Sequence, residues 1–234
     1  MNVCVLGASG GLGSNISENL LENGCKLINC YRIKPGKSKI AKKEKKNVEH
    51  RFIDTRTLCK ASEGLERIFR NAQVDCIVNA MGIGRSTYSP SNNMPIPTVD
   101  LSTREWEEII FINLKFPILV TQLALKHEIK KVIHIGSALT AKGIRGTAMA
   151  QAYSASKKAI YDYCEHMNEI AGEQLSIACL APGLVRTKMS EGKGLEKIFE
   201  SQLEPSTVSQ WTLAMVEESS MPMTLLLPFV RDKA

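Results

Sequence analysis

Short apolar runs alternate with segments of helical periodicity along the whole chain. The apolar runs predict strands, because strands buried inside a parallel sheet are continuously hydrophobic. Between them, apolar residues recur at spacings of three and four, which predicts amphipathic helices. The expected strands are 2–6, 26–30, 48–53, 74–79, 131–136, 175–181 and 223–227, and the expected helices are 13–22, 60–72, 103–127, 153–172 and 206–218.

This alternation predicts an α/β fold, a single doubly wound Rossmann-type domain whose parallel β-sheet carries helices on both faces. The crossovers between its strands should be right-handed. A chain of 234 residues suits one domain and can bury a sizeable core. Because no internal repeat or linker-like change of composition divides it, we expect one domain over residues 1–234.

The formal net charge of +6 is concentrated in part in the segment 34–46, which has seven lysines and one glutamate. Two interpretations of this segment stay open. It is either a solvated loop or helix face, or a surface that attracts a phosphate-bearing cofactor or an acidic carrier. Aromatic residues do not interleave the lysines, so a nucleic-acid partner is not expected.

The seven cysteines are an odd number and contain no CxxC motif. Several of them, including Cys4, Cys76 and Cys179, fall in strand-like runs, which indicates reduced buried thiols and a reducing compartment. The four histidines lack metal-ligand spacing, so no metal site is expected. No run of 18 apolar residues and no charged leader at the N-terminus is found, and we therefore expect a cytoplasmic protein without a membrane partner.

The first candidate for chemistry is the glycine-rich stretch "LGASGGLG" (6–13), between the first strand and the first helix. Gly7, Gly11 and Gly13 allow a tight turn and close approach of the backbone to a pyrophosphate, whose charge the helix N-terminal amides would meet. The spacing is G-x-x-x-G-x-G, which differs from the common G-x-G-x-x-G fingerprint. Its place after an N-terminal strand predicts dinucleotide binding.

The end of the second strand should meet the adenosine ribose of such a dinucleotide. Tyr31 occupies the place where a carboxylate would bind the 2′-hydroxyl of NAD, and Arg32 follows it. Arg32, Lys34 and Lys37 are instead suited to a 2′-phosphate, since guanidinium groups donate to phosphate oxygens in pairs. NADP(H) is therefore favoured over NAD(H), the alternative being that Arg32 is an ordinary surface residue.

Seven motifs in a consistent order complete the pattern. They are "LGASGGLG" (6–13), "FIDT" (52–55), "DCIVNAMGI" (75–83), "EWEEIIFINL" (105–114), "IGSA" (135–138), "YSASK" (153–157) and "APGLVRTKM" (181–189). With them the chain resembles the classical short-chain dehydrogenase/reductase family from Met1 to about Met189.

The resemblance implies a catalytic tetrad of Asn113, Ser137, Tyr153 and Lys157. Tyr153 would pass a proton to or from the substrate oxygen, Ser137 would donate a hydrogen bond to the same oxygen, and Asn113 would hold a helix kink and a relay water. Lys157 lies one turn after Tyr153 on the same helix face, so its charge is expected to favour tyrosinate and lower the pKa of Tyr153. The implied cofactor-binding residues are Gly7, Ser9, Gly11, Leu12, Gly13, Tyr31, Arg32, Asp54 (at the adenine), Thr55, Asn79, Ala80, Gly82, Tyr153, Lys157, Pro182, Val185 and Thr187.

The chain also departs from the family pattern. Leu6 replaces a threonine before the glycine turn, and Ala80 replaces an asparagine. The loop between Ser137 and Tyr153 is longer than usual, and the C-terminal segment 224–234 lacks the usual glycine-rich turn. Residues 188–204 would form a lid over the substrate.

The expected function is hydride transfer between nicotinamide and a small-molecule carbonyl or alcohol substrate. One alternative is a nucleotide-sugar epimerase or dehydratase, which the short segment after Gly183 argues against. Another is a non-catalytic dinucleotide-sensing protein of the same fold. The resemblance further implies a homodimer or homotetramer built through helices 103–127 and 153–172. The identity of the substrate, whose pocket should include residues 84–97, is not predicted.

Overall fold

A single parallel sheet forms the centre of the chain in the computed structural model, which describes residues 1–32, 47–84, 101–138, 151–190, 202–218 and 224–226. The described residues contribute seven strands in the order β3-β2-β1-β4-β5-β6-β7, and each predicted strand is present. The strands are β1 (Asn2–Leu6), β2 (Lys26–Tyr31), β3 (Val48–Phe52), β4 (Cys76–Asn79), β5 (Lys131–Ile135), β6 (Ser176–Ala181) and β7 (Thr224–Leu226).

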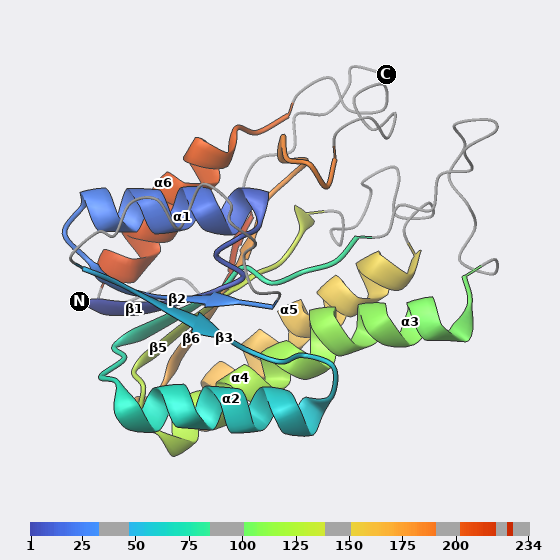
Figure 1. Cartoon of the computed structure of the whole chain (residues 1–234). Helices are drawn as coiled ribbons and strands as arrows, with labels where there is room; N and C mark the ends of the chain where they lie inside the picture. The colour runs from blue at the N-terminus through green and yellow to red at the C-terminus, as the bar shows by residue number, and fades with distance from the viewer. Residues whose placement is uncertain (33–46, 85–100, 139–150, 191–201, 219–223, 227–234) are drawn as a thin grey trace.

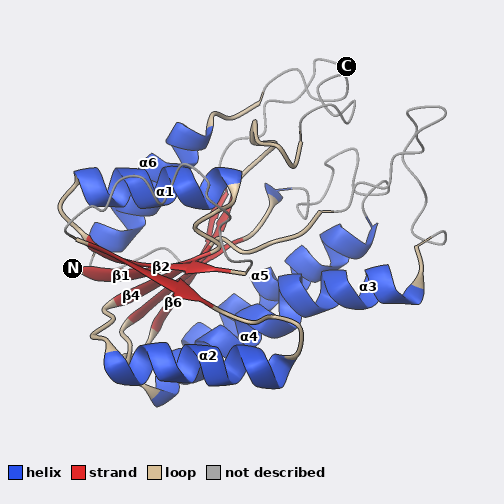
Figure 2. Ribbon diagram, in the orientation of Figure 1, coloured by secondary structure: helices blue, strands red, loops and turns tan. Residues whose placement is uncertain are grey.

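Helices cover both faces of this sheet (Figure 1, Figure 2). α1 and α6 lie on one face, and α2, α4 and α5 lie on the other. Each predicted helix is present, so the α/β architecture with a parallel sheet and helices on both faces is confirmed. The helices are α1 (Gly11–Glu22), α2 (Leu58–Asn71), α3 (Thr103–Ile110), α4 (Phe116–Lys126), α5 (Gln151–Ala171) and α6 (Pro205–Glu217), with a π-helix, η3 (Phe111–Lys115), between α3 and α4.

Two hydrophobic cores follow from these layers, because successive side chains of a strand point to opposite faces of a sheet. The core under α2, α4 and α5 contains Leu65, Phe116 and Ile160, whereas the core under α1 and α6 contains Ile16 and Val208. All these side chains are buried. Both faces of the sheet are therefore shielded from water. The ends of the strands are the side of the sheet that stays open.

The strand order reverses between β1 and β4, which lie next to each other although β2 and β3 separate them in sequence. In open α/β sheets, ligands bind in the crevice outside the carboxyl ends of the strands at such a switch point. The glycine turn follows β1 and the segment Ala80–Gly82 follows β4. The topology therefore brings the predicted cofactor residues to one edge.

The continuous helical stretch Thr103–Lys126 is long and apolar enough to cross a membrane by composition alone, and it is the one such stretch among the residues that the structure describes. Half of its most apolar window is buried inside the protein. Packing against the sheet accounts for the apolar character of this stretch, as expected for a core helix.

All seven cysteines are free thiols, and six of them are buried, Cys59 being the exposed one. The predicted burial of Cys4, Cys76 and Cys179 is confirmed. Burial raises the pKa of the Cys76 thiol to about 12, so this side chain stays protonated and behaves as a small apolar group. The cytoplasmic location remains a prediction.

Several predicted features lie wholly or largely outside the described residues. They are the lysine-rich segment 34–46 with Lys34 and Lys37, the pocket segment 85–97, the loop 139–150, the centre of the predicted lid (191–201) and the end of the chain (227–234).

The first testable prediction concerns Gly13, which lies close to the backbone of Gly7 in the same glycine turn. A Cβ on Gly13 would lie 2.2 Å from the Gly7 carbonyl oxygen, a separation that forces the backbone to move. We expect Gly13→Ala to lower the free energy of unfolding by about 1–3 kcal/mol, the usual cost of overpacking.

Urea denaturation would measure this change, with Gly24→Asn as the control. Gly24 has a positive φ, of +84°, but nothing lies within 4 Å of an added Cβ, and asparagine tolerates this conformation. Equal stability of Gly13→Ala and wild type would show that the turn is looser than the structure indicates.

Candidate active site

The glycine turn joins β1 to α1 through backbone contacts. Gly7 has a φ of +86°, and the N–H groups of Gly7 and Ala8 donate to the Cys30 carbonyl of β2 at 3.0 and 3.2 Å. α1 then begins at Gly11 without an acidic residue in its first turn. Helix geometry leaves the first N–H groups without an intrahelical acceptor, so this end suits an anion. Ser9 and Gly11 are exposed at this edge, and Leu12 is half-buried.

The side chains of Tyr31 and Arg32, at the end of β2, lie in different surroundings. The Tyr31 side chain is buried in the core under α1, and its hydroxyl lies 2.6 Å from Nδ1 of His50. The Tyr31 side chain therefore lies in the core, and a contact of this residue with the ribose stays a prediction. The Arg32 side chain instead pairs with α3, where its Nη1 lies 3.6 Å from Oε1 of Glu108. Both side chains are about one-third exposed.

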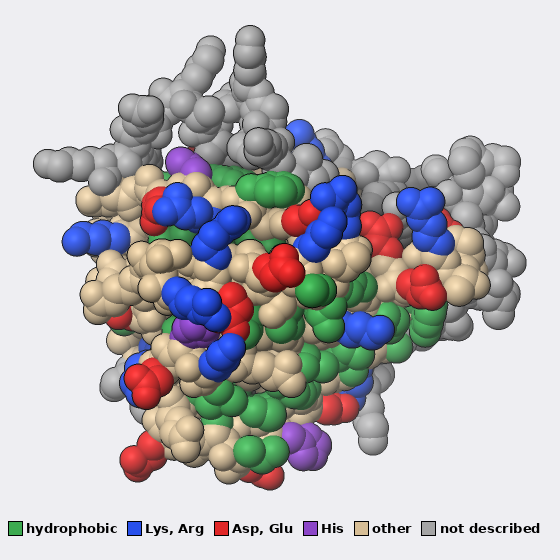
Figure 3. Space-filling view, turned by 60° about the horizontal axis from the view of Figure 1, so that its bottom comes forward, with side chains coloured by type: hydrophobic (Ala, Val, Ile, Leu, Met, Phe, Trp, Pro, Cys, Tyr) green, Lys and Arg blue, Asp and Glu red, His purple; other side chains and the backbone are tan. Residues whose placement is uncertain are grey.

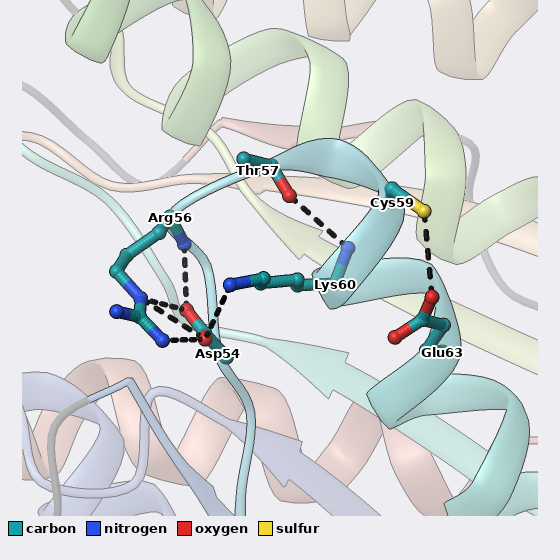
Figure 4. A network of polar contacts seen from close by, with 6 residues as sticks. All are labelled: Asp54, Arg56, Thr57, Cys59, Lys60 and Glu63. Atoms are coloured by element: carbon teal, nitrogen blue, oxygen red, sulfur yellow. Dashed lines mark hydrogen bonds and ion pairs between the residues drawn. The ribbon is translucent and has the colours of Figure 1, made fainter.

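Asp54 follows β3 and is held by a basic neighbour that the sequence patterns do not single out (Figure 4). Arg56 donates to the Asp54 carboxylate from its backbone N–H and from Nε and Nη2, at 3.0, 2.9 and 2.5 Å. Lys60 Nζ lies 4.0 Å from the same carboxylate. The side-chain hydrogen bond from Arg56 is the main cause that lowers the pKa of Asp54 to about 2. Thr55, another predicted residue, lies between Asp54 and Arg56 in the loop before α2.

The segment after β4 packs closely against the glycine turn and α5. The Ala80 N–H donates to the Leu6 carbonyl at 2.9 Å. A Cβ on Gly82 would lie 3.4 Å from Nζ of Lys157 and 3.7 Å from Oδ1 of Asn113. The backbone at Gly82 therefore lies directly beside two members of the predicted tetrad.

Asn113 lies in the π-helix η3, which interrupts the stretch between α3 and α4. Its amide makes a two-way contact with Ile83, accepting from the Ile83 N–H and donating to the Ile83 carbonyl, both at 2.9 Å. The same Nδ2 lies 3.2 Å from Oγ of Ser156, whose hydroxyl donates to the Tyr153 carbonyl at 2.7 Å. A helix irregularity at this residue agrees with the expected kink, since π-turns concentrate at functional sites.

Ser137, Tyr153 and Lys157 meet at the carboxyl end of β5. The Tyr153 side chain is hydrogen-bonded to Ser137, and Nζ of Lys157 lies 5.9 Å from the centre of the Tyr153 ring. Nζ of Lys157 donates to the Ile135 carbonyl at 2.7 Å. Ser137 and Lys157 are buried, whereas Tyr153 is half-buried. The structure thus brings the four predicted residues into one connected group.

Burial sets the protonation of this pair. It raises the pKa of Tyr153, and the hydrogen bond with Ser137 offsets part of that effect. It also lowers the pKa of Lys157 to about 8. The expected lowering of the Tyr153 pKa is therefore not found for the chain by itself, because loss of water outweighs the hydrogen bond with Ser137. Near neutral pH the tyrosine is the neutral, proton-bearing form.

The loop after β6 closes the other side of the crevice. The Pro182 carbonyl accepts from the Ala138 N–H at 2.8 Å. The Thr187 N–H donates to Oγ of Ser190, whose hydroxyl lies 2.7 Å from the Val185 carbonyl. A Cβ on Gly11 would lie 3.2 Å from Cβ of Thr187, so this loop lies over the glycine turn.

Gly84 and Met189 border the ring of Tyr153. A Cβ on Gly84 would lie 3.6 Å from Cδ2 of Tyr153 and 3.3 Å from Sδ of Met189. Neither residue belongs to a predicted set of contacts with the cofactor. They place an apolar rim, partly exposed at Met189, beside the tyrosine.

The family of the chain follows from comparison with known proteins. Residues 1–197 match the model of the short chain dehydrogenase family. The chain is 26% identical over 220 residues to the 3-oxoacyl-[acyl-carrier-protein] reductase FabG of Buchnera aphidicola subsp. Schizaphis graminum, covering 92% of this chain and 84% of that protein. It is 23% identical over 198 residues to the 2-dehydro-3-deoxy-D-gluconate 5-dehydrogenase of Escherichia coli K12, covering 80% of this chain and 72% of that protein.

Solved structures share the fold. A closed form of serine dehydrogenase complexed with NADP⁺ superimposes with a TM-score of 0.81 at 21% identity, over 100% of this chain and 97% of that one. A variant of the actinorhodin polyketide ketoreductase with NADPH gives a TM-score of 0.79 at 19% identity, over 97% of this chain and 96% of that one. With the family model matching most of its length, the chain belongs to the short-chain dehydrogenase family of oxidoreductases.

Proposed function

We propose that this chain is an NADP(H)-dependent carbonyl reductase or alcohol dehydrogenase in which Tyr153 is the acid–base residue. The observation that carries the proposal is the meeting of Tyr153, Ser137 and Lys157 beside Gly82 at the switch point of the sheet. A tyrosine with a hydrogen-bonding serine and a buried cation can hold and move a proton at one oxygen atom.

The residues present fit a dinucleotide. The turn at Gly7 has a positive φ, the first turn of α1 is free of acidic side chains, and Gly82 leaves room beside Lys157 that a Cβ would fill. Backbone amides would hold the pyrophosphate at the glycine turn, while Lys157 would hold the nicotinamide ribose. When bound, the cofactor supplies or accepts the hydride.

In the reducing direction, the neutral hydroxyl of Tyr153 donates its proton to the substrate carbonyl oxygen. Burial favours this proton-bearing form, because it raises the pKa of Tyr153. Ser137 donates a hydrogen bond to the same oxygen and stabilises the negative charge that develops there. Lys157 in its charged form stabilises the tyrosinate that remains.

Asn113 acts at the backbone. By pairing with both polar groups of Ile83, it fixes the segment after β4 that carries Gly82, and through Ser156 it also fixes the turn of α5 that carries Tyr153. Holding these two segments together keeps Tyr153 oriented toward the crevice.

NADP(H) is supported over NAD(H) by the charges at the adenosine end. Arg32 at the end of β2 is about one-third exposed, and so is the Glu108 carboxylate that pairs with it, so a phosphate can take the place of this carboxylate. The serine dehydrogenase and polyketide ketoreductase structures are named as complexes with NADP⁺ and NADPH.

The substrate proposed is a small-molecule carbonyl compound or alcohol. The similar proteins named above act, by their names, on a 3-oxoacyl carrier and on a sugar acid, so the shared chemistry is the CH–OH/C=O pair. The apolar rim formed by Gly84 and Met189 lies where a substituent of the carbonyl carbon would rest.

We also propose a homo-oligomer, formed in the cytoplasm through the helices α4 and α5. The side chains Ile118, Tyr161 and Met167 on these helices are only partly buried in the core. The helical face at the bottom of Figure 1 shows hydrophobic patches between charged side chains (Figure 3). A second copy would cover these patches.

Removing the hydroxyl of Tyr153 tests the acid–base role. Tyr153→Phe should keep the affinity for NADPH but slow the chemical step by roughly 10²–10⁴-fold, the usual contribution of a positioned acid–base group. The measurement is single-turnover oxidation of NADPH with any carbonyl compound that the wild type reduces.

Tyr161→Phe is the matched control, since it makes the same chemical change farther along α5 and should keep the wild-type rate. Near-wild-type turnover by Tyr153→Phe would rule out this residue as the proton donor.

The cofactor preference depends on Arg32. Arg32→Ala should weaken NADPH binding by about 1.5–3 kcal/mol, the range for a hydrogen bond to a charged group, and leave NADH nearly unchanged. Isothermal titration calorimetry with both cofactors measures the difference.

Glu108→Gln is its control, because it removes the carboxylate beside Arg32 but keeps the guanidinium. This variant should bind NADPH at least as tightly as the wild type. Equal losses for both cofactors in Arg32→Ala, or a wild type that prefers NADH, would contradict the assignment of the 2′-phosphate.

Lys157 predicts a dependence of stability on pH. Its pKa is about 8 in the folded chain and 10.5 as its ordinary value, so between these pH values the unfolded chain binds more protons than the folded chain. Stability therefore rises with pH in that window, and the cost of burying the charge is fully present below it.

Lys157→Met lacks this contribution. Relative to that variant, the wild type should gain free energy of unfolding as the pH rises from about 8 to 10.5, measured by urea denaturation at several pH values. A difference that stays constant across the window would mean that Lys157 keeps its ordinary pKa in the folded chain.

A further inference from the structure

A buried histidine on the central strand β5 plays no part in the proposed chemistry. His134 is 1% exposed, and both of its ring nitrogens have polar neighbours. Nδ1 lies 3.2 Å from Nδ2 of Asn79, and Nε2 lies 2.9 Å from Oγ1 of Thr121. Asn79 and Thr121 are buried as well, at 2% and 0% exposure. Three buried polar side chains therefore form a chain from β4 through β5 to α4.

The contacts of Asn79 indicate the direction of each hydrogen bond in this chain. Oδ1 of Asn79 accepts from the Met81 N–H at 3.2 Å, so Nδ2 faces His134 and can only donate. Nδ1 of His134 must then be the acceptor, and Nε2 carries the one hydrogen of the neutral ring. Oγ1 of Thr121 accepts that hydrogen, while its own hydroxyl donates to the Pro117 carbonyl at 3.2 Å.

The ring is neutral for a physical reason. Burial is the main cause that lowers the pKa of His134 to about 3, and the nearby charge of Lys157 adds to it. A protonated ring would place a hydrogen on Nδ1 against the donating amide of Asn79. The chain of hydrogen bonds is therefore in one arrangement near neutral pH.

One end of this chain reaches the cofactor segment. Asn79 binds the N–H of Met81, and the Met81 backbone lies against the glycine turn, since a Cβ on Gly7 would be 3.0 Å from Met81 N. At the far end of the same short segment, Ile83 is held by Asn113. The residues between Asn79 and Ile83 are thus fixed at both ends by buried amides, and His134 holds the first of them.

We propose that His134 is a positioning residue for the dinucleotide, holding the segment between Asn79 and Ile83 in its binding conformation by accepting a hydrogen bond from Asn79. The proposal rests on the proposed function, because it assigns a cofactor to this edge of the sheet. Without the acceptor, the Asn79 amide would be buried with an unpaired donor and would rotate to find another partner. The Met81 N–H would then lose its acceptor, and the segment beneath the dinucleotide would loosen.

The experiment compares three variants by NADPH titration followed through cofactor fluorescence. His134→Leu removes the acceptor and keeps a similar volume, and it should weaken NADPH binding roughly 3- to 10-fold, the equivalent of one neutral hydrogen bond. His134→Asn returns an acceptor oxygen near the place of Nδ1 and should restore most of the affinity. kcat at saturating NADPH should change less than the affinity does, because Tyr153 and Lys157 are held by other contacts.

Val132→Ala is the matched control for lost stability. Val132 lies on the same face of β5, is fully buried, and packs in the same core without a polar contact of its side chain. This variant should unfold more easily than the wild type but bind NADPH normally. If His134→Leu also bound NADPH normally, or if Val132→Ala lost as much affinity as His134→Leu, the positioning role would be overturned while the proposed function stood. A wild type that bound neither NADPH nor NADH would overturn both.

A second measurement needs no cofactor. The ¹⁵N chemical shifts of the His134 ring, assigned by loss of its signals in His134→Asn, should show the neutral tautomer with hydrogen on Nε2 at neutral pH. Hydrogen on Nδ1, or a charged ring, would break the chain of hydrogen bonds at Asn79 and overturn the proposal even if His134→Leu failed to fold.

Discussion

The two-way hydrogen bond between the amide of Asn113 and the backbone of Ile83 is the contact on which the geometry of the site depends. It joins the helix α3–η3–α4 to the segment after β4, and Ser156 extends it to α5. A regular α-helix presents its side chains at fixed angles, and the π-turn shifts that register at Asn113. Losing the amide would leave both polar groups of Ile83 unpaired in a half-buried place, at a cost of about 1–3 kcal/mol for each fully buried group.

Burial around this contact determines the protonation of Lys157 and Tyr153. Lys157 is nearly closed to water and donates to the Ile135 carbonyl, while Tyr153 carries a proton that burial makes harder to lose. A buried cation whose pKa lies close to neutrality is easily converted between its two forms by a new neighbour. The site is therefore responsive to the charge and hydrogen bonds that a bound cofactor would bring.

The strands and helices were predictable because burial on both faces gives parallel strands a continuously apolar sequence, as in "NVCVL" and "SIACL". The burial of the Tyr31 side chain was not predicted, although strand alternation carried the signal. Leu27 and Tyr31 have the same parity on β2 and both pack in the core under α1. The face of the strand, and not the place in the motif, determines where this side chain lies.

Contacts between side chains that are far apart in sequence could not be predicted, for a different reason. Arg56 on Asp54, Glu108 near Arg32, and His134 between Asn79 and Thr121 depend on rotamers and on how closely the elements pack. Gly13 was expected to make room for a pyrophosphate, and the structure shows that it first makes room for the Gly7 carbonyl. The four residues of the predicted tetrad could be named because each is tied to a motif, and the sheet topology then brings them together.

The central claim is that the crevice at the β1–β4 switch point holds the dinucleotide with its nicotinamide end at Tyr153 and Lys157. A crystal structure of the chain with NADP⁺ tests it most directly and needs no knowledge of the substrate. We expect the pyrophosphate at the first turn of α1, and we expect Nζ of Lys157 to leave the Ile135 carbonyl for a ribose hydroxyl. A dinucleotide bound elsewhere, or a Lys157 that keeps its contact with Ile135 while the ribose lies out of its reach, would contradict this account.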